Sequence, residues 1–293
     1  MVNDPHSPQI WCNGIPQDPE NHGLPIHHPA ILYGESAFET FKVVKGKPLY
    51  LGEHLERLQK TVVGLGLGSP YSASGLEEEV RQALDSLHDA PNGWRVRVTL
   101  VSERTALMGL DGKEAPIQRW LMAVPIGDGI GKPLRVSISP FHKIPPGSLP
   151  PSWKHGNYLS SLLSLRQAQQ RGFDDAILVT ESGIVTEGTS ANLFWIRDRQ
   201  LATCSDDLIF QGLTRDRVIR YAESEQIPIH CGHFAVEELR QADEVFFTSS
   251  VRGIVPIQRV ETSHYSVGDP DSMTMKIARD LRDLDLQEAV GSC

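Results

Sequence analysis

The sequence lacks long apolar runs, low-complexity tracts and blocks of like charge. None of its apolar runs approaches the roughly 20 residues that a membrane-spanning helix requires, so we expect no membrane partner. Residues 1–8 have neither a basic start nor an apolar stretch, so no secretory signal is expected. The net charge of −9 comes from interspersed acids and bases, which argues against binding to nucleic acid. These absences argue against certain partners, but they do not by themselves point to a function.

Cysteines are few and widely spaced. The four, at positions 12, 204, 231 and 293, include no Cys-x-x-Cys pair. We therefore expect no disulfide framework and a reducing, cytoplasmic location. Cys231 and His233 would supply two ligands to a metal, but no second pair lies at ligand spacing. No metal site is expected.

The composition that is present is that of a globular protein with two domains. Of the 293 residues, 40% are hydrophobic and 22% are charged, and this length can bury two separate cores. The best linker is 126–133, with three glycines and a proline in eight residues. We expect a small N-terminal α/β domain at 1–125 and a larger C-terminal α/β domain at 134–293.

Helical and strand periodicities alternate along both halves without a strict βαβ rhythm, which predicts an α+β fold. Leu55, Leu58 and Val62 recur at helical spacing, whereas 95–101 alternates polar and apolar residues as a half-buried strand does. Helices are predicted at 52–67, 76–87, 158–171 and 214–226, the last capped by Thr214. Strands are predicted at 31–33, 38–44, 95–101, 120–124, 134–139, 192–196, 244–248 and 253–257, with a hairpin at 176–186.

Two residues of the C-terminal half carry complementary chemistry. Lys154 lies just before a predicted helix, where its amine can form an imine if it is desolvated. Glu187 follows a predicted hairpin strand, and its carboxylate can hold a protonated heterocycle. The order of predicted elements between Lys154 and Glu187 is compatible with both side chains facing one pocket.

Three further segments are suited to binding a phosphate. The start of the helix at Leu213 and Thr214 offers backbone N–H groups and a hydroxyl. Ser249 and Ser250 follow a strand and offer two more hydroxyls, and Arg57 can add a charge-assisted contact.

The order of these motifs resembles the class IV aminotransferase family, the fold-type IV pyridoxal phosphate enzymes. The resemblance covers roughly Ile10 to Val260. The motifs that carry it are Tyr33–Thr40, His54–Leu58, Lys154 with Asn157 and Tyr158, Glu187–Phe194, Gly212–Arg215 and Ser249-Ser250.

The resemblance implies a two-domain fold with pyridoxal 5′-phosphate in the cleft between the domains, and a homodimer. By position, Lys154 is similar to the Schiff-base lysine and Glu187 to the partner of the pyridine nitrogen. Tyr158 is similar to the residue that contacts the phenolic oxygen of the cofactor. The phosphate positions are matched by Arg57, Leu213, Thr214, Ser249 and Ser250.

Within the family, two features resemble the aminodeoxychorismate lyases. Asn157 follows Lys154 by three residues, as in the lyases and the D-amino acid enzymes, and Thr40 stands where branched-chain aminotransferases carry glycine. A hydroxyl at Thr40 can help to relay a proton. Against this, the run after Asn157 is similar to branched-chain enzymes, and 103–109 shares little with the glycine- and arginine-rich loop of some lyases.

The resemblance to the lyases implies 4-amino-4-deoxychorismate as substrate, giving 4-aminobenzoate and pyruvate for folate biosynthesis. A transaminase of branched-chain or D-amino acids is the alternative, although the Arg-x-His carboxylate trap of the D-amino acid enzymes is missing. Arg95 and Arg97 share one face of a strand, and we assign Arg97 to the substrate carboxylates. Tyr33 and Phe38 are assigned to the substrate pocket, and Lys154 with Thr40 to catalysis.

Overall fold

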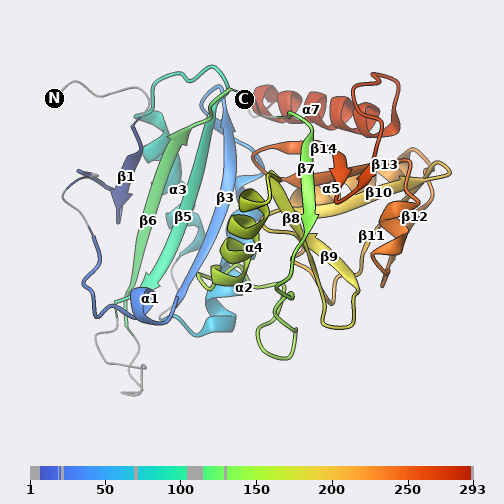
Figure 1. The fold of residues 1–293 in the computed structure, drawn as a ribbon. Helices are drawn as coiled ribbons and strands as arrows, with labels where there is room; N and C mark the ends of the chain where they lie inside the picture. Colours follow the sequence, from blue (N-terminus) through green and yellow to red (C-terminus); the bar gives the residue numbers. More distant parts are fainter. Residues whose placement is uncertain are drawn as a thin grey trace. The chain divides into compact units, whose positions relative to one another are not determined.

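The computed structural model describes residues 7–18, 20, 23–68, 72–103, 115–128 and 131–291. They form two compact units (Figure 1). The first unit takes its residues from 1–128, 153–157 and 288–293, and the second from 129–152 and 158–287. The chain first changes unit within the segment 126–133. The segment 153–157, which contains Lys154, packs with the first unit although it lies inside the C-terminal half of the sequence.

The first unit is an antiparallel sheet covered by helices, with strand order β2-β1-β6-β5-β3-β4. Its strands are β1 (Gln9–Cys12), β2 (Ile15–Gln17), β3 (Ser36–Val44), β4 (Lys47–Pro48), β5 (Trp94–Ser102) and β6 (Ile117–Pro125). Its helices are α1 (Pro29–Leu32), α2 (Leu51–Leu65) and α3 (Ala73–Asp85). Alternation puts Phe41 and Val96 on the face where they pack with Leu58 of α2 and Val80 of α3. This apolar layer is the core of the unit.

The second unit is built on a mixed sheet in which β10, β13, β14, β7, β8 and β9 form a closed ring of hydrogen-bonded strands. Its strands are β7 (Leu134–Ile138), β8 (Asp175–Val179), β9 (Val185–Gly188), β10 (Asn192–Arg197), β11 (Gln200–Cys204), β12 (Ile229–Gly232), β13 (Glu244–Ser249), β14 (Gly253–Val260) and β15 (Ser263–His264). Its helices are α4 (Leu159–Gln170), α5 (Leu213–Ser224), α6 (Glu237–Arg240) and α7 (Met273–Gly291), the last of which belongs to this unit up to Gln287. The ring closes where Glu187 pairs with Asn192.

The predicted α+β class is confirmed, and two local predictions are wrong. Residues 31–33 were expected to form a strand, but Pro29–Leu32 is a short helix. Its N-cap is His28, whose Nδ1 accepts a hydrogen bond from the Ala30 N–H, and Pro29 suits the first turn of a helix. Thr214 does not cap α5, because the N-cap is Gly212. No helix formed by the described residues combines the length and apolar character that a membrane crossing needs.

Candidate active site

Lys154 is attached to the first unit through the edge of β3. The Phe38 N–H donates to the Lys154 carbonyl at 2.9 Å, and the Gly156 N–H donates to the Ser36 carbonyl at 3.0 Å. Ala37 and His155 pair between them as an antiparallel bridge. Directly opposed residues share a face, and the Lys154 Nζ lies 4.9 Å from the centroid of the Phe38 ring. The backbone of a strand therefore fixes where the amine lies.

Glycines allow this segment to dock so closely. A Cβ on Gly156 would lie 2.4 Å from Ser36 Oγ and 2.8 Å from the Gly34 carbonyl oxygen. A Cβ on Gly64 of α2 would lie 2.4 Å from the indole of Trp153. Both distances are far inside van der Waals contact, so a side chain at either position would push the segment outward.

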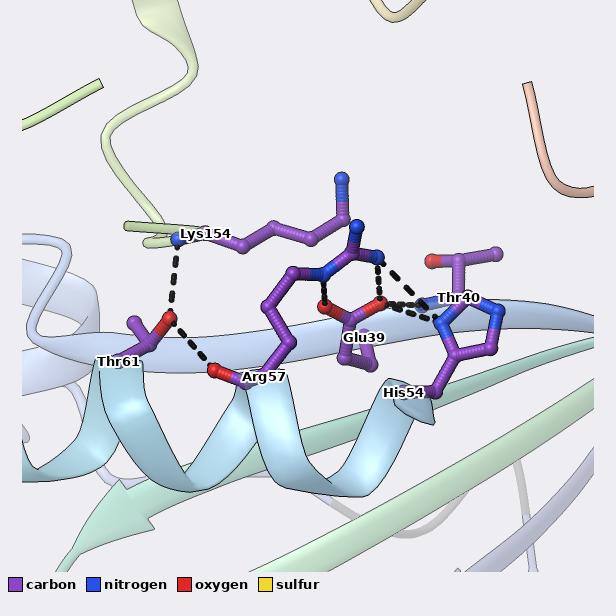
Figure 2. A network of polar contacts seen from close by, with 6 residues as sticks. All are labelled: Glu39, Thr40, His54, Arg57, Thr61 and Lys154. Atoms are coloured by element: carbon purple, nitrogen blue, oxygen red, sulfur yellow. Dashed lines mark hydrogen bonds and ion pairs between the residues drawn. The ribbon is translucent and has the colours of Figure 1, made fainter. Parts of the chain in front are cut away.

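A buried carboxylate and two helix residues form the polar centre of the first unit, where Figure 2 shows α2 presenting His54 and Arg57 to Glu39 of β3. Arg57 Nε donates to Glu39 Oε1 at 2.6 Å and Arg57 Nη2 donates to Oε2 at 2.8 Å. His54 Nδ1 donates to Oε2 at 2.8 Å. The Glu39 side chain is fully buried. The guanidinium is thus held by both oxygens, the geometry in which arginine is most strongly oriented.

The pKa values of this cluster follow from burial and charge together. Burial by itself raises the pKa of Glu39, but the charge of Arg57 and the hydrogen bonds from His54 and Arg57 outweigh it and bring the pKa to about 2. Burial lowers the pKa of His54 and, together with the charges of Arg57 and Lys154, outweighs the hydrogen bond and charge of Glu39, which raise it. The carboxylate is ionised at neutral pH and the imidazole is neutral, with its proton on Nδ1.

Thr61 connects this cluster to Lys154. Its hydroxyl donates to the Arg57 carbonyl at 3.3 Å and accepts from the Lys154 N–H at 3.2 Å (Figure 2). The side chain is buried within α2. One hydroxyl therefore ties the backbone of the helix to the backbone of the lysine segment.

Thr40 and Arg97 are direct cross-strand partners on β3 and β5. Phe38 lies two residues before Thr40, on the same face of the strand, and its ring centroid is 3.5 Å from the Arg97 guanidinium carbon. Arg97 is half-buried and donates to Thr99, whereas Arg95 is exposed. The structure thus brings together four residues that the sequence assigned to catalysis or to the substrate: Phe38, Thr40, Arg97 and Lys154.

Tyr33, which the sequence assigned to the substrate pocket, lies at the surface of the first unit. It ends the short helix α1, and 44% of its surface is exposed. Residues 104–109, which form most of the loop compared with the lyases and the D-amino acid enzymes, lie outside the described residues.

In the second unit, Glu187 is held by the strands around it. Its Oε2 accepts from the Asn192 side-chain amide at 3.1 Å and from the Phe210 N–H at 3.2 Å. Its Oε1 forms an ion pair with the Lys143 ammonium. The Asn192 amide also donates to the Phe210 carbonyl at 2.7 Å. The carboxylate is therefore oriented by fixed backbone and amide groups.

Asn192 also connects Glu187 to the predicted phosphate segments. A Cβ on Gly212, the N-cap of α5, would lie 2.2 Å from Asn192 Oδ1. Thr248 pairs with Asn192 across β10 and β13, and its buried hydroxyl has no hydrogen-bond partner among the described residues. Around Asn192 the second unit thus gathers Glu187, the α5 start that carries Leu213 and Thr214, and the strand end that leads to Ser249 and Ser250. Tyr158 is the N-cap of α4 in the same unit.

The sequence analysis missed Lys143, Glu39 and His54. Glu39 had a readable signal, since it occupies a position that alternation places on the buried face of β3, between Ala37 and Phe41. An acid at such a position requires a buried cation. Lys143 had no comparable signal, because its ion pair joins segments 44 residues apart.

The fold and these residues define the class of protein. The chain matches the amino-transferase class IV family over residues 36–260 and belongs to that family. It is 27% identical over 281 residues to a provisionally named branched-chain-amino-acid aminotransferase of Methanocaldococcus jannaschii, which covers 94% of this chain and 96% of the relative. It is 29% identical over 264 residues to the aminodeoxychorismate lyase of Bacillus subtilis, covering 87% and 88%.

A solved structure of a similar protein supports the fold assignment. The branched-chain aminotransferase of the thermophilic archaeon Thermoproteus uzoniensis, solved with norvaline, superposes with a TM-score of 0.87. It is 26% identical and covers 96% of this chain and 95% of the other.

Proposed function

We propose that this protein is a pyridoxal 5′-phosphate-dependent 4-amino-4-deoxychorismate lyase, which forms 4-aminobenzoate and pyruvate for folate biosynthesis. The observation that carries the proposal is the cluster of Thr40 and Arg97, paired across two strands, on the face where Phe38 contacts the Lys154 amine. Membership of the family and the similarity to the Bacillus subtilis lyase support it.

The residues present fit this cofactor. The oriented carboxylate of Glu187 suits a protonated pyridine nitrogen, and Tyr158 is proposed for the phenolic oxygen. The N-cap glycine of α5 leaves the first backbone N–H groups of the helix to an anion. The buried Thr248 hydroxyl, which has no partner within the described part of the chain, is a further donor. The guanidinium of Arg57 is held rigidly by Glu39. The proposal also assigns Leu213, Thr214, Ser249 and Ser250 to the cofactor.

The bound cofactor would supply an electron sink for the charge left on the substrate when a proton is removed. Lys154 would remove the proton from the amine-bearing carbon of the substrate, and Arg97 would hold a substrate carboxylate. Thr40 would assist the protonation of the departing enolpyruvyl oxygen. Loss of this group leaves an aromatic ring, which drives the reaction without an amino-group acceptor.

Transamination is the second candidate. The relatives from the two archaea are branched-chain aminotransferases by name, and one was solved with norvaline. In that case Lys154 would move the proton to the cofactor, with no leaving group to be protonated, and Arg97 would hold the α-carboxylate of an amino acid. Thr40 would then have no part in the chemistry.

Product analysis separates the two candidates. Purified protein loaded with pyridoxal phosphate is mixed with aminodeoxychorismate alone or with branched-chain or D-amino acids plus 2-oxoglutarate. We expect 4-aminobenzoate and pyruvate in equal amounts from the first mixture. We expect Thr40→Val to lower kcat by about 100-fold, with Thr40→Ser, which keeps the hydroxyl, close to the parent enzyme. Rapid glutamate formation without 4-aminobenzoate would establish the transaminase instead.

The cofactor assignment has its own test. We expect the purified protein to show an absorbance band near the visible edge that Lys154→Ala abolishes. A protein without such a band, after incubation with pyridoxal phosphate, would contradict the assignment.

We further propose that the protein is a cytoplasmic homodimer. The four scattered cysteines support a reducing compartment. Leu159, Leu162 and Leu163 are exposed on α4 by 64%, 44% and 37%, and exposed apolar patches of this kind mark protein interfaces.

A further inference from the structure

One cation of the second unit lies against the carboxylate that the proposed function gives to the cofactor. Lys143 follows β7, and its backbone N–H donates to the Val179 carbonyl at the end of β8 at 2.8 Å. Its ammonium forms an ion pair with Glu187 Oε1. The two side chains are only 18% and 9% exposed, so the pair is largely desolvated. A pair at such a position is far more sensitive to loss of one partner than a surface pair.

The two oxygens of Glu187 are held in different ways. Oε2 accepts from two neutral donors, the Asn192 amide at 3.1 Å and the Phe210 N–H at 3.2 Å, and both are fixed by the surrounding strands and loop. Oε1 is compensated by an ammonium on a flexible stem, and a carboxylate oxygen can accept more than one hydrogen bond. The orientation of the carboxylate therefore persists without Lys143, whereas its charge compensation depends on Lys143.

We propose that Lys143 is the resident counter-ion of Glu187, which stabilises this carboxylate before the cofactor binds and weakens its hold on the ring nitrogen afterwards. The inference rests on the proposed function, because it takes the ring nitrogen as the second cation beside Glu187. Two cations at one carboxylate repel each other, so the ammonium disfavours protonation of the ring. Lys143 thereby limits how strongly the cofactor is held and how readily its ring accepts electrons.

Replacement of Lys143 by methionine tests this directly, because methionine keeps the length of the stem and removes the charge. We expect the cofactor-free Lys143→Met protein to have a lower Tm than the parent protein, since a buried carboxylate loses its partner. We expect the same variant to bind pyridoxal phosphate about tenfold more tightly, since a competing cation is gone. A purely structural role would lower both stability and affinity.

Nitrogen NMR with cofactor labelled at the ring nitrogen gives a readout independent of activity. In Lys143→Met the ring nitrogen should stay protonated to a pH about one unit higher than in the parent protein. A cofactor analogue with carbon in place of the ring nitrogen should lose the gain in affinity, because it brings no cation to Glu187.

Two variants serve as controls. Lys143→Arg keeps the charge and should behave like the parent protein in both measurements. Lys276→Met removes the lysine of an exposed pair with Glu225, 3.1 Å apart in the same unit, and should change neither. Unchanged or weaker cofactor binding by Lys143→Met overturns the inference. If the parent protein binds no pyridoxal phosphate, the proposed function fails as well, so the two failures are distinguishable.

Discussion

Glu39 occupies a position on β3 that alternation gives to apolar side chains. Its neighbours on that face, Ala37 and Phe41, are fully buried in the core of the first unit. An ionised carboxylate at such a site is stable only because Arg57 and His54 donate to it. In return the carboxylate fixes the guanidinium that the proposed function gives to a phosphate. Stability and binding are thus coupled through one side chain.

This coupling predicts how stability depends on pH. The pKa of Glu39 is about 2 in the folded protein, against an ordinary value of 4.5. A lowered pKa contributes stability that is complete above pH 4.5 and is lost as the pH falls toward 2. For Glu39 this amounts to about 3 kcal/mol. We expect Glu39→Gln to be destabilised by about this amount at neutral pH, and the difference from the parent protein to shrink between pH 4.5 and 2, as measured by urea unfolding of the cofactor-free protein.

The groups that contact Glu39 determine which controls the pH comparison of Glu39→Gln needs. Arg57 keeps its charge throughout, but His54 also titrates in acid, so the comparison is repeated in a His54→Gln background. Glu77→Gln removes an acid whose pair with Arg81 is exposed, and it should cost less than about 1 kcal/mol at any pH. A constant difference between Glu39→Gln and the parent protein across this range would show that the carboxylate does not act through its charge.

At the scale of elements, the docking of segment 153–157 depends on a glycine as well as on hydrogen bonds. The hydrogen bonds from Phe38 to Lys154 and from Gly156 to Ser36 can form only if the segment approaches β3 closely. Gly156 permits this approach, since a Cβ there would lie 2.4 Å from Ser36 Oγ.

We therefore expect Gly156→Ala to lower the free energy of unfolding by about 1–3 kcal/mol and to weaken cofactor binding, because the Lys154 amine moves with its backbone. Unfolding and the cofactor absorbance measure the two effects. Gly147→Ala is the matched control, because a Cβ at Gly147 meets no atom within 4 Å. Equal stability of the two variants would argue against close docking.

The elements were predictable where the local pattern was strong. The apolar stripe of α2 and the alternation of β5 led to helices and strands at nearly the observed residues. The α1 region was mistaken for a strand because three apolar residues in a row suit either structure, and the cap at His28 decides between them. Contacts between distant residues, such as Lys143 with Glu187, follow from the topology of the sheet and have no local signal.

At the scale of the whole molecule, the exposed leucines of α4 predict self-association. We expect the protein to have twice its chain mass of 32.5 kDa in sedimentation equilibrium. A double substitution, Leu162→Ser with Leu163→Ser, should shift it toward the monomer, because it removes apolar surface from the proposed interface. Leu284→Ser changes a leucine of α7 that is 46% exposed and should leave the dimer intact. A parent protein that sediments as a monomer would contradict the proposal.

The pairing of Lys154 with the edge of β3 has a consequence for how the chain is synthesised and how it folds. The strand partner of Phe38 is more than a hundred positions away, so this edge of β3 cannot be paired until the ribosome has released the chain beyond Lys154. Closing so long a loop costs conformational entropy, which is offset only when the contacts between the two segments have formed. The lysine should therefore reach its place late in folding, after the first sheet has formed, and a nascent chain cut before residue 153 cannot complete this edge.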